Sequence, residues 1–416
     1  MNSYDRINKL EAVLKASKAI HSILDLNDLL SAILSNSIEC IGAARGTIYL
    51  IDNNKDIFWS KVHTGEKKLT IELPLGIGVA GYVAKTGETV NVKNTSNDNR
   101  FYDEIDNSSG FTTKNMLCMP LEDRKGNILG VFQLLNKKNA PYFTDSDEEF
   151  IEAFSIHASI AIEKARLYEL EKQNADIEKE LFAAGEVQKK LFPTELPNLP
   201  GYKLAAINIP AGQTSGDLYD FVQLENGKIV FCLGDVSGKG LPAALIMANL
   251  QSLLHTFPLI NASPSYCVSK ANQIIEKATS REKFITLFFG ILDSVNHKIT
   301  YTNAGHESPF FIHNRSSSQL SEGGLPAGIF ENAVYDEENI DIQPGDLLVV
   351  FSDGIADATN TSGQFFTEER FKNLLIKNID ESPQKIIDIV RNELTNYTAN
   401  EPQFDDITLC IIKREE

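Results

Sequence analysis

The stretch Gly234-Asp235-Val236-Ser237-Gly238-Lys239-Gly240 joins the end of an expected strand to a tight turn. An apolar, β-branched run over residues 229–233 precedes it, and residues 241–254 predict a helix after it. The glycines let the backbone fold closely around a small group. An aspartate beside free backbone carbonyls suits a hard cation, although the same composition is also typical of an ordinary turn.

Aspartates recur at the ends of apolar strands in the second half of the chain. Asp353 follows one apolar run, Asp406 precedes another, and Asp217 begins a third. Because strand ends converge at one edge of a sheet, we expect these carboxylates to meet Asp235 there. Carboxylates packed together repel one another, and divalent cations remove that cost. Ligands that are all oxygen indicate magnesium, manganese or calcium rather than zinc.

The ordered motifs of this half resemble those of SpoIIE-type protein phosphatases, the bacterial branch of the metal-dependent PPM phosphatases. The resemblance covers residues 193–416 and implies an αββα sandwich, in which two sheets lie between helices. The sequence departs from the family at Ser215, where glycine is commoner, and over residues 355–358, where many relatives have Thr-Glu-Ala. The motifs are Ser215-Gly216-Asp217-Leu218-Tyr219-Asp220, residues 234–240, Tyr301-Thr302-Asn303-Ala304-Gly305-His306, Ser352-Asp353-Gly354 and Asp405-Asp406-Ile407-Thr408.

The resemblance also implies a metal site and a reaction. Asp235 is expected to bridge two manganese or magnesium ions, with the Val236 carbonyl as a further ligand. Asp353 and Asp406 are expected to complete one ion, and Asp217 to hold the other directly or through its waters. A water shared by two such cations loses its proton near neutral pH and attacks phosphorus. The implied substrate is a phosphoserine or phosphothreonine protein, in this family a small anti-sigma-factor antagonist.

The composition excludes several classes of partner. The 39 Lys and Arg residues and 57 Asp and Glu residues give a net charge of −18 without a long basic run, which argues against nucleic acid and against anionic membranes. The five scattered cysteines show no metal spacing and no disulfide framework, so a reducing cytoplasm is expected. No apolar run is long enough to span a bilayer, so no membrane partner is expected.

The first part of the chain predicts a sensor domain of the α+β class. Helices are expected over residues 4–40, and turn signals separate short strands between residues 41 and 142. Residues 20–165 resemble a GAF domain, and Asn136-Lys137, Phe143 and Asp147-Glu148 match the signature of the cyclic-nucleotide-binding subgroup. In relatives the signature lysine and aspartate form an ion pair near the pocket lid. The strands are expected over residues 47–51, 57–62, 89–92, 115–120 and 128–135.

The cyclic-nucleotide subgroup implies a set of ligand-binding residues. A glycine-rich turn over residues 76–81 enters a helix, and free amides there can bind a phosphate. Arg45 and Thr47 match an Arg-x-Thr that faces the base in cAMP-binding relatives, so cAMP is favoured over cGMP. Many GAF domains instead bind another small molecule or nothing. The other implied contacts are the Val79 and Ala80 amides, the Ser109 and Thr113 hydroxyls, and Gln133.

A regular helix is expected between the two domains. Apolar residues recur at 3,4 spacing from Ile156 to Leu191, and Asn174 at one core position favours a parallel two-stranded coiled coil, hence a homodimer. The alternative is one amphipathic helix packed on its own domain. Gly185 and Gln188 weaken the seam before the catalytic domain and mark a candidate switch. The expected organisation is a GAF domain with its N-terminal helices over residues 1–155, a coiled-coil linker over 156–192 and a phosphatase domain over 193–416.

These inferences combine into one functional hypothesis with two alternatives. The chain is expected to be a cytoplasmic, cyclic-nucleotide-regulated, metal-dependent serine/threonine protein phosphatase of a bacterial signalling pathway. The first alternative is a non-catalytic cyclic-nucleotide receptor whose phosphatase-like half only docks a partner. The second is a constitutive phosphatase whose GAF domain serves only dimerisation. The identity of the phosphoprotein and the sign of the regulation stay open.

Overall fold

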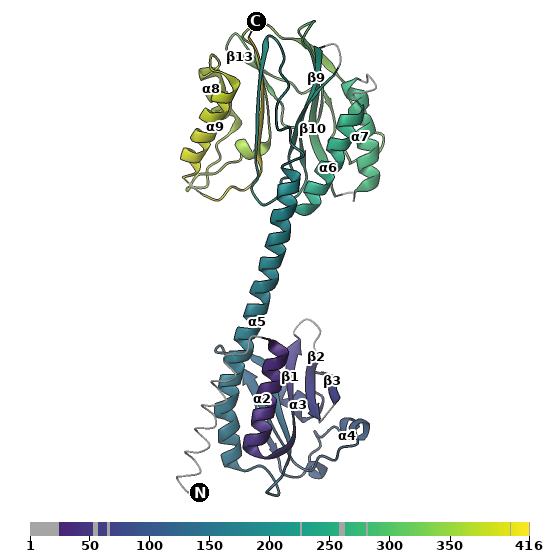
Figure 1. Cartoon of the computed structure of the whole chain (residues 1–416), viewed down its shortest axis with the longest axis vertical. Helices are drawn as coiled ribbons and strands as arrows, with labels where there is room; N and C mark the ends of the chain where they lie inside the picture. Colours follow the sequence, from purple (N-terminus) through teal and green to yellow (C-terminus); the bar gives the residue numbers. More distant parts are fainter. Residues whose placement is uncertain are drawn as a thin grey trace. The chain divides into compact units, whose positions relative to one another are not determined.

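The structure is a computed structural model of the whole chain, and it describes residues 25–52, 57–64, 67–224, 227–257, 263–279, 282–399 and 401–415. The chain divides into two compact units, Met1–Asp176 and Ile177–Glu416, and each is described by itself (Figure 1). The helix expected within residues 4–24 lies outside the described residues, as do the side chains of residues 52–73 and 108–109. Within the described part, no helix is both long and apolar enough to cross a membrane.

The first unit is built on a six-stranded antiparallel sheet in the order β3-β2-β1-β6-β5-β4. Its helices are α2 (Leu26–Ile41), α3 (Gly78–Thr86), α4 (Glu104–Ser109) and the start of α5 (Asp145–Gln188). The expected strands are all present, and β3 is an additional one that the sequence did not indicate. The strands are β1 (Ala43–Asp52), β2 (Ile57–Thr64), β3 (Lys67–Pro74), β4 (Val90–Val92), β5 (Met116–Glu122) and β6 (Ile128–Lys137).

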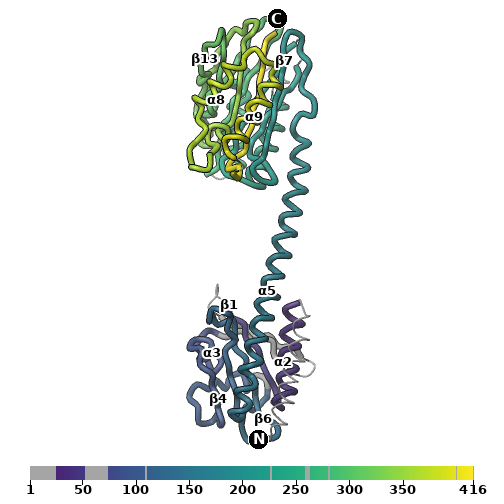
Figure 2. Tube along the Cα trace, turned by 90° about the vertical axis from the view of Figure 1, so that its left-hand side faces the viewer, coloured from purple at the N-terminus to yellow at the C-terminus, as the bar shows by residue number. Residues whose placement is uncertain are grey.

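Both faces of this sheet are covered. One core joins α2 and the first turns of α5 to the sheet, and a second core lies under α3 (Figure 2). The Asp25 side chain caps α2 by accepting from the amides of Asn27 and Asp28, and Gly42 ends that helix at a positive φ of 71°. Strand alternation therefore divides the apolar side chains between the two faces.

Helix α5 (Asp145–Gln188) is 44 residues long, and its surroundings change along its length. Ala158, Ile162 and Ala165 are buried in the sensor core. The first turns of the expected linker therefore pack as part of the first unit. Further along, Leu170 and Ile177 are 56% and 55% exposed, which leaves apolar side chains on the helix surface without cover from the described chain.

The second unit contains two sheets that pack face to face, and their strands pair antiparallel except for the short parallel pair of β11 and β14. One sheet has the order β14-β11-β10-β9-β8, with β15 paired to β11, and the other has the order β13-β12-β16-β17-β7. The first sheet is made of β8 (Leu218–Gln223), β9 (Lys228–Val236), β10 (Ile285–Asp293), β11 (Lys298–Ala304), β14 (Gly323–Gly324) and β15 (Glu338–Asp341). The second is made of β7 (Tyr202–Ile209), β12 (Phe310–His313), β13 (Ser316–Gln319), β16 (Leu347–Phe351) and β17 (Ile407–Arg414).

Burial on both faces explains the continuous apolar runs that the sequence shows. In β9, Phe231 and Leu233 face the core between the sheets, whereas Val230 and Cys232 face the core under the outer helices. Helices α6 (Leu241–Thr256) and α7 (Pro264–Ala278) cover one sheet (Figure 1). Helices α8 (Glu368–Lys377) and α9 (Pro383–Thr398) cover the other. The structure confirms the α+β class and the αββα sandwich.

Candidate functional site

Four of the predicted carboxylates approach one edge of the sandwich. Asp235 lies near the end of β9, and Asp217 lies directly before β8, the neighbouring strand. Asp353 follows β16 after Ser352, and Asp406 precedes β17. Because β8 and β9 belong to one sheet and β16 and β17 to the other, each sheet contributes two of these aspartates.

The backbones of the two segments in the second sheet lie against one another. A Cβ added at Gly354 would lie 2.1 Å from the carbonyl oxygen of Asp406, so glycine is required there. The Ser352 hydroxyl donates to the same carbonyl at 3.1 Å and accepts from the Thr408 amide at 2.9 Å. Asp353 and Asp406 are therefore held at a fixed separation by the strand ends that carry them.

The pKa values show that these carboxylates repel one another. Burial raises the pKa of Asp217 well above its usual range, and the charges of Asp235 and Asp406 add to that shift. Burial, followed by the charges of Asp353 and Asp405, raises the pKa of Asp235 to about 6. Burial and Asp405 also raise the pKa of Asp353. The edge therefore lacks enough positive charge of its own.

Two adjacent aspartates at this edge have different environments. The Asp406 carboxylate accepts from the Ala211 amide at 2.7 Å, the Ser215 hydroxyl at 2.8 Å and the Gly216 amide at 2.7 Å. Asp405 instead contributes its charge to Asp235 and Asp353, as their pKa shifts show. The sequence did not single out Asp405 as a ligand, and only its place beside Asp406 in the motif pointed to it.

The donor chemistry of the edge fits divalent cations. Its candidate ligands are carboxylates and the Val236 carbonyl, which lies 3.2 Å from where a Cβ of Gly216 would be. All are hard oxygen donors, and a cation would relieve the repulsion that raises their pKa values. In the described part of the chain, no three Asp, Glu, His or Cys side chains are already arranged as a metal-binding group.

His306 is buried and hydrogen-bonded to Asn303 and Thr286. Its backbone amide donates to Asn303 Oδ1 at 2.7 Å, and Asn303 Nδ2 donates to the His306 carbonyl at 3.0 Å. Nδ1 of the ring lies 2.9 Å from the Thr286 hydroxyl. Burial lowers the pKa of His306 to about 4, so the ring is neutral at physiological pH and holds a turn.

The end of helix α5 contacts the loop that carries Asp217. Gln188 is 6% exposed, its Nε2 donates to the Ser215 carbonyl at 2.7 Å, and its Oε1 accepts from the Ser215 amide at 2.8 Å. A Cβ at Gly185 would lie 2.0 Å from the Gln213 carbonyl oxygen. Gly185 and Gln188 therefore do more than weaken a coiled-coil seam, because both residues pack against the loop over residues 213–215 of their own unit.

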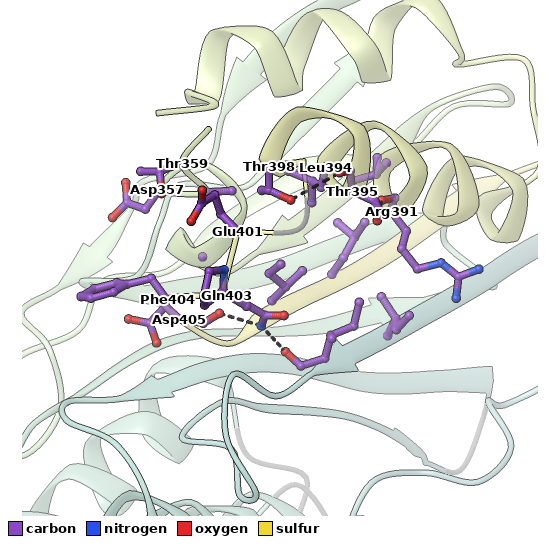
Figure 3. A pocket seen from close by; sticks show the side chains of 18 of the residues that line it. Asp357, Thr359, Arg391, Leu394, Thr395, Thr398, Glu401, Gln403, Phe404 and Asp405 are labelled. Atoms are coloured by element: carbon purple, nitrogen blue, oxygen red, sulfur yellow. Dashed lines mark hydrogen bonds between the residues drawn. The ribbon is translucent and has the colours of Figure 1, made fainter. Parts of the chain in front are cut away.

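An apolar cavity of about 370 Å³ lies beside the carboxylate edge (Figure 3). Leu394 on α9, Ile207 on β7 and Ile407 on β17 line it, and Phe404 and Asp405 are also among its lining residues. The Phe404 side chain is 77% exposed. The cavity and the carboxylate edge therefore share Asp405.

In the first unit, several predicted ligand residues lie on one face of the sheet. Thr47 on β1 pairs in register with Gln133 on β6, and both side chains are largely buried. The Tyr49 hydroxyl donates to Gln133 Oε1 at 3.4 Å. Arg45, two residues before Thr47, stacks its guanidinium 3.9 Å from the centroid of the Phe111 ring. Strand alternation brings Arg45, Thr47 and Tyr49 to this common face.

The remaining predicted contacts lie around helix α3 and the segment after α4. Val79 and Ala80 are in the first turn of α3 and pack in the core with Tyr49. No side chain caps the start of that helix. The Thr113 amide and hydroxyl donate to the two carboxylate oxygens of Asp106, at 2.6 and 2.7 Å. The Ser109 side chain lies outside the described residues.

The expected ion pair of the GAF signature is present. Lys137 Nζ lies 2.9 Å from Asp147 Oδ1 and donates to the Ile41 carbonyl at 2.7 Å. Asp147 also accepts from the Thr144 amide and hydroxyl, both at 3.0 Å. Burial alone would raise the pKa of Asp147, but these hydrogen bonds outweigh it and lower the pKa. The pair therefore ties β6, α2 and the start of α5 together.

Comparison with known families agrees with this division of the chain. Residues 225–415 match the family of stage II sporulation protein E (SpoIIE), and residues 25–162 match the GAF domain. The chain is 29% identical over 242 residues to phosphoserine phosphatase RsbU of Bacillus subtilis, spanning 58% of this chain and 71% of that protein. It is 36% identical over 197 residues to the dual 3′,5′-cyclic-AMP and -GMP phosphodiesterase 11A of Takifugu rubripes.

That second match spans 44% of this chain but only 22% of the phosphodiesterase. Among solved structures, the SiaA-PP2C domain of Pseudomonas aeruginosa matches with a TM-score of 0.51 and 17% identity, covering 59% of this chain and 99% of that domain. This likeness supports the fold of the second unit. The chain therefore carries a GAF domain over residues 25–162 and, after it, a domain of the SpoIIE family over residues 225–415.

Proposed function

We propose that this chain hydrolyses phosphoserine or phosphothreonine on a protein, with divalent cations held at the carboxylate edge and a cyclic nucleotide as regulator. The observation that carries the proposal is that four carboxylates meet at one edge. The pKa values of Asp217, Asp235 and Asp353 are raised there, and the charge of Asp405 contributes to the shifts of Asp235 and Asp353. RsbU, a relative over 58% of this chain, is named a phosphoserine phosphatase. The proposed signalling role, dephosphorylation of an anti-sigma-factor antagonist, rests on the resemblance of the sequence motifs to those of SpoIIE-type phosphatases.

The chain's own residues divide the work at this edge. Asp235, Asp217 and Asp353 would hold manganese or magnesium, together with the Val236 carbonyl, and Asp405 joins them on the strength of its charge at Asp235. When bound, the cations supply a water that ionises near neutral pH. Asp406, which was also expected to be a ligand, orders Ala211, Ser215 and Gly216 through its hydrogen bonds.

A direct test is manganese-dependent hydrolysis of p-nitrophenyl phosphate by the full chain. Asp353→Asn should lose at least about a hundredfold in kcat/KM, roughly 2.7 kcal/mol of barrier, because it removes a charged cation ligand. Asp357→Asn, which changes a neighbouring exposed aspartate, is the matched control and should retain most activity. A wild-type chain that is inactive with manganese and magnesium would favour the non-catalytic receptor instead.

The apolar cavity beside Asp405 supports a protein substrate. A phosphoserine held at the edge would bring neighbouring residues of the substrate past Phe404, and an apolar one of them fits the cavity lined by Leu394 and Ile207. Two synthetic phosphoserine peptides, with leucine or alanine near the phosphoserine, test this. Thr395→Trp, which fills the cavity, should abolish any preference for leucine and leave p-nitrophenyl phosphate hydrolysis unchanged. Asn396→Trp, on the next α9 position, is the control.

Regulation by a cyclic nucleotide rests on the GAF signature and on the face that presents Arg45, Thr47 and Gln133. The phosphodiesterase 11A relative is named for both cAMP and cGMP, and the Arg45 and Thr47 match favours cAMP here. Phosphatase activity titrated with cAMP and cGMP tests the proposal. Binding of neither nucleotide to the full chain below about 100 μM, roughly −5.5 kcal/mol, would leave a constitutive phosphatase.

The proposed assembly is a homodimer through a parallel coiled coil of α5. Leu167, Leu170 and Ile177 are each more than half exposed in the single chain, and they are the predicted core positions of that coil. The proposed compartment is the cytoplasm, since all five cysteines are free thiols.

A further inference from the structure

Lys239 lies over the segment that carries Asp405. Its Nζ is 3.2 Å from Asp405 Oδ2, donates to the Phe404 carbonyl, and lies 4.0 Å from the centroid of the Phe404 ring. Gly238 and Gly240 on either side have positive φ values of 92° and 76°. The turn that follows Asp235 and Val236 thus places the ammonium group of Lys239 at the carboxylate edge.

Lys239 contacts both Asp405 and the Phe404 ring. Its side chain is nevertheless 52% exposed, so solvent and small ligands reach the ammonium group. A surface pair of this kind contributes little to stability, about 0–1 kcal/mol. Another anion can therefore readily replace Asp405 as the partner of Lys239.

A phosphomonoester brings about two negative charges at neutral pH. At the edge it meets aspartates, and cations bound there are largely neutralised by those same carboxylates. A protein cation that reaches the phosphoryl oxygens would offset the remaining charge and orient the group. Lys239 meets this need because it lies beside Asp405 and is accessible to solvent. A bound divalent cation would also attract Asp405, which would leave the ammonium group free to bind the phosphoryl oxygens.

The neighbouring Lys283 is engaged differently. Its Nζ donates to the Ser237 carbonyl at 3.0 Å, and a Cβ at Gly238 would lie 2.3 Å from that nitrogen. Ser237 is further fixed by its hydroxyl, which accepts from the Phe284 amide at 2.9 Å. Lys283 thus stabilises the backbone of the turn, whereas the side chain of Lys239 extends away from the turn toward Asp405.

We infer that Lys239 binds the phosphoryl group of the substrate, and that Asp405 holds the ammonium group in place when no substrate is present. This inference deepens the proposed phosphatase function and rests on it. It assigns Lys239 a positioning role toward the phosphoryl oxygens of any phosphomonoester, independent of the rest of the substrate. The role requires only its positive charge, so arginine should serve in its place.

The test uses the full chain with manganese and three variants. Lys239→Met removes the charge and keeps an apolar stem, and Lys239→Arg keeps the charge. Lys277→Met is the matched control. Lys277 is an exposed lysine on α7, and its Nζ lies 2.7 Å from a carboxylate oxygen of Glu331. The measurements are KM and kcat for p-nitrophenyl phosphate, the affinity for inorganic phosphate by calorimetry with manganese present, and the affinity for manganese itself.

Lys239→Met should weaken phosphate binding and raise KM by about tenfold, the loss of one charged hydrogen bond. Manganese affinity should stay within about threefold of wild type, since no cation ligand is lost. Lys239→Arg and Lys277→Met should keep phosphate affinity. A loss of phosphate affinity below about fivefold in Lys239→Met, or a parallel loss of manganese affinity, overturns the inference.

The two proposals fail in different ways. If the wild-type chain hydrolyses no phosphomonoester, the proposed function fails, and calorimetry with inorganic phosphate still decides the role of Lys239. If the wild type is active and Lys239→Met binds phosphate as the wild type does, the phosphatase function stands and the role of Lys239 is refuted.

Discussion

The side-chain amide of Gln188 makes two hydrogen bonds to the backbone of Ser215. Gln188 Nε2 donates to the Ser215 carbonyl at 2.7 Å, and the Ser215 amide donates to Gln188 Oε1 at 2.8 Å. The Ser215 hydroxyl in turn donates to Asp406 and accepts from the Asp217 amide at 3.1 Å. The last turn of α5 is thus two hydrogen-bonded steps from a candidate metal carboxylate.

Gln188→Leu should therefore impair the metal site as well as the helix end. The substitution leaves the Ser215 amide and carbonyl buried without partners, at a cost of about 1–3 kcal/mol for each group. We expect weaker manganese binding by calorimetry and reduced turnover. Val187→Ala, at the neighbouring position where the side chain is 65% exposed, is the control. Unchanged manganese affinity in Gln188→Leu would show that α5 does not order the loop.

Asp235→Asn should abolish turnover yet stabilise the metal-free protein at neutral pH. The folded protein raises the pKa of Asp235 from 3.8 to about 6, so this group's contribution to stability is full below pH 3.8 and is lost as the pH rises to about 6. His306 acts in the opposite direction, because its pKa is lowered to about 4. The informative quantity is therefore the difference in melting temperature between variant and wild type.

That difference should move in favour of Asp235→Asn between about pH 4 and pH 6.5, measured by thermal unfolding without divalent cations. Addition of manganese should reverse the order at neutral pH, because only the wild type has the full ligand set. A pH-independent difference would mean that Asp235 is not repelled by its neighbours in the folded protein.

Lys137→Met should destabilise the sensor domain through its buried partner. The side chains of Lys137 and Asp147 are 14% and 3% exposed, and removing one member of a buried ion pair costs about 3–5 kcal/mol. Chemical unfolding of the full chain should show an earlier transition for the sensor domain, together with weaker nucleotide binding. The double variant Lys137→Met/Asp147→Leu should lose less than the sum of the two single variants. Additive losses would argue against a coupled pair.

Leu170→Asp should convert the proposed dimer to a monomer. Leu170 is 56% exposed in the single chain and occupies a predicted core position, where a carboxylate would face its symmetry mate. Light scattering measures the mass directly. Lys172→Asp introduces the same residue at an outer position of the same heptad and should leave the dimer intact. A monomeric wild-type chain would exclude the coiled coil.

Residues buried on both faces made the second unit predictable. Continuous apolar runs such as those of β9 and β16 are typical of interior strands. β9 begins within one residue of the expected start at residue 229, but it continues to Val236, three residues past the expected end at residue 233. β7 was missed because its side chains are mostly half-buried, so no strong period appears in its sequence. β3 pairs with β2 at the end of the sheet order, where packing imposes less on the sequence.

The candidate site was predictable as a region but not atom by atom. The sequence indicates that Asp405 and Asp406 lie at a strand start, yet it cannot show which carboxylate turns to the backbone amides of Ala211 and Gly216. Those partners are about two hundred residues away in sequence, as the Asp406–Ala211 separation of 195 shows. Gln188 illustrates the same limit, since its partner Ser215 cannot be inferred from helical periodicity.

The anchoring of Asp406 also determines how the site should respond to a chelator. Its carboxylate accepts three hydrogen bonds from residues 211–216, so protein donors hold that loop in place without any cation. Removal of the cations with a chelator should therefore leave the loop over residues 211–216 folded. Reconstitution with fresh cation should be rapid and complete, without a refolding step, and one preparation should allow different metals to be exchanged in turn.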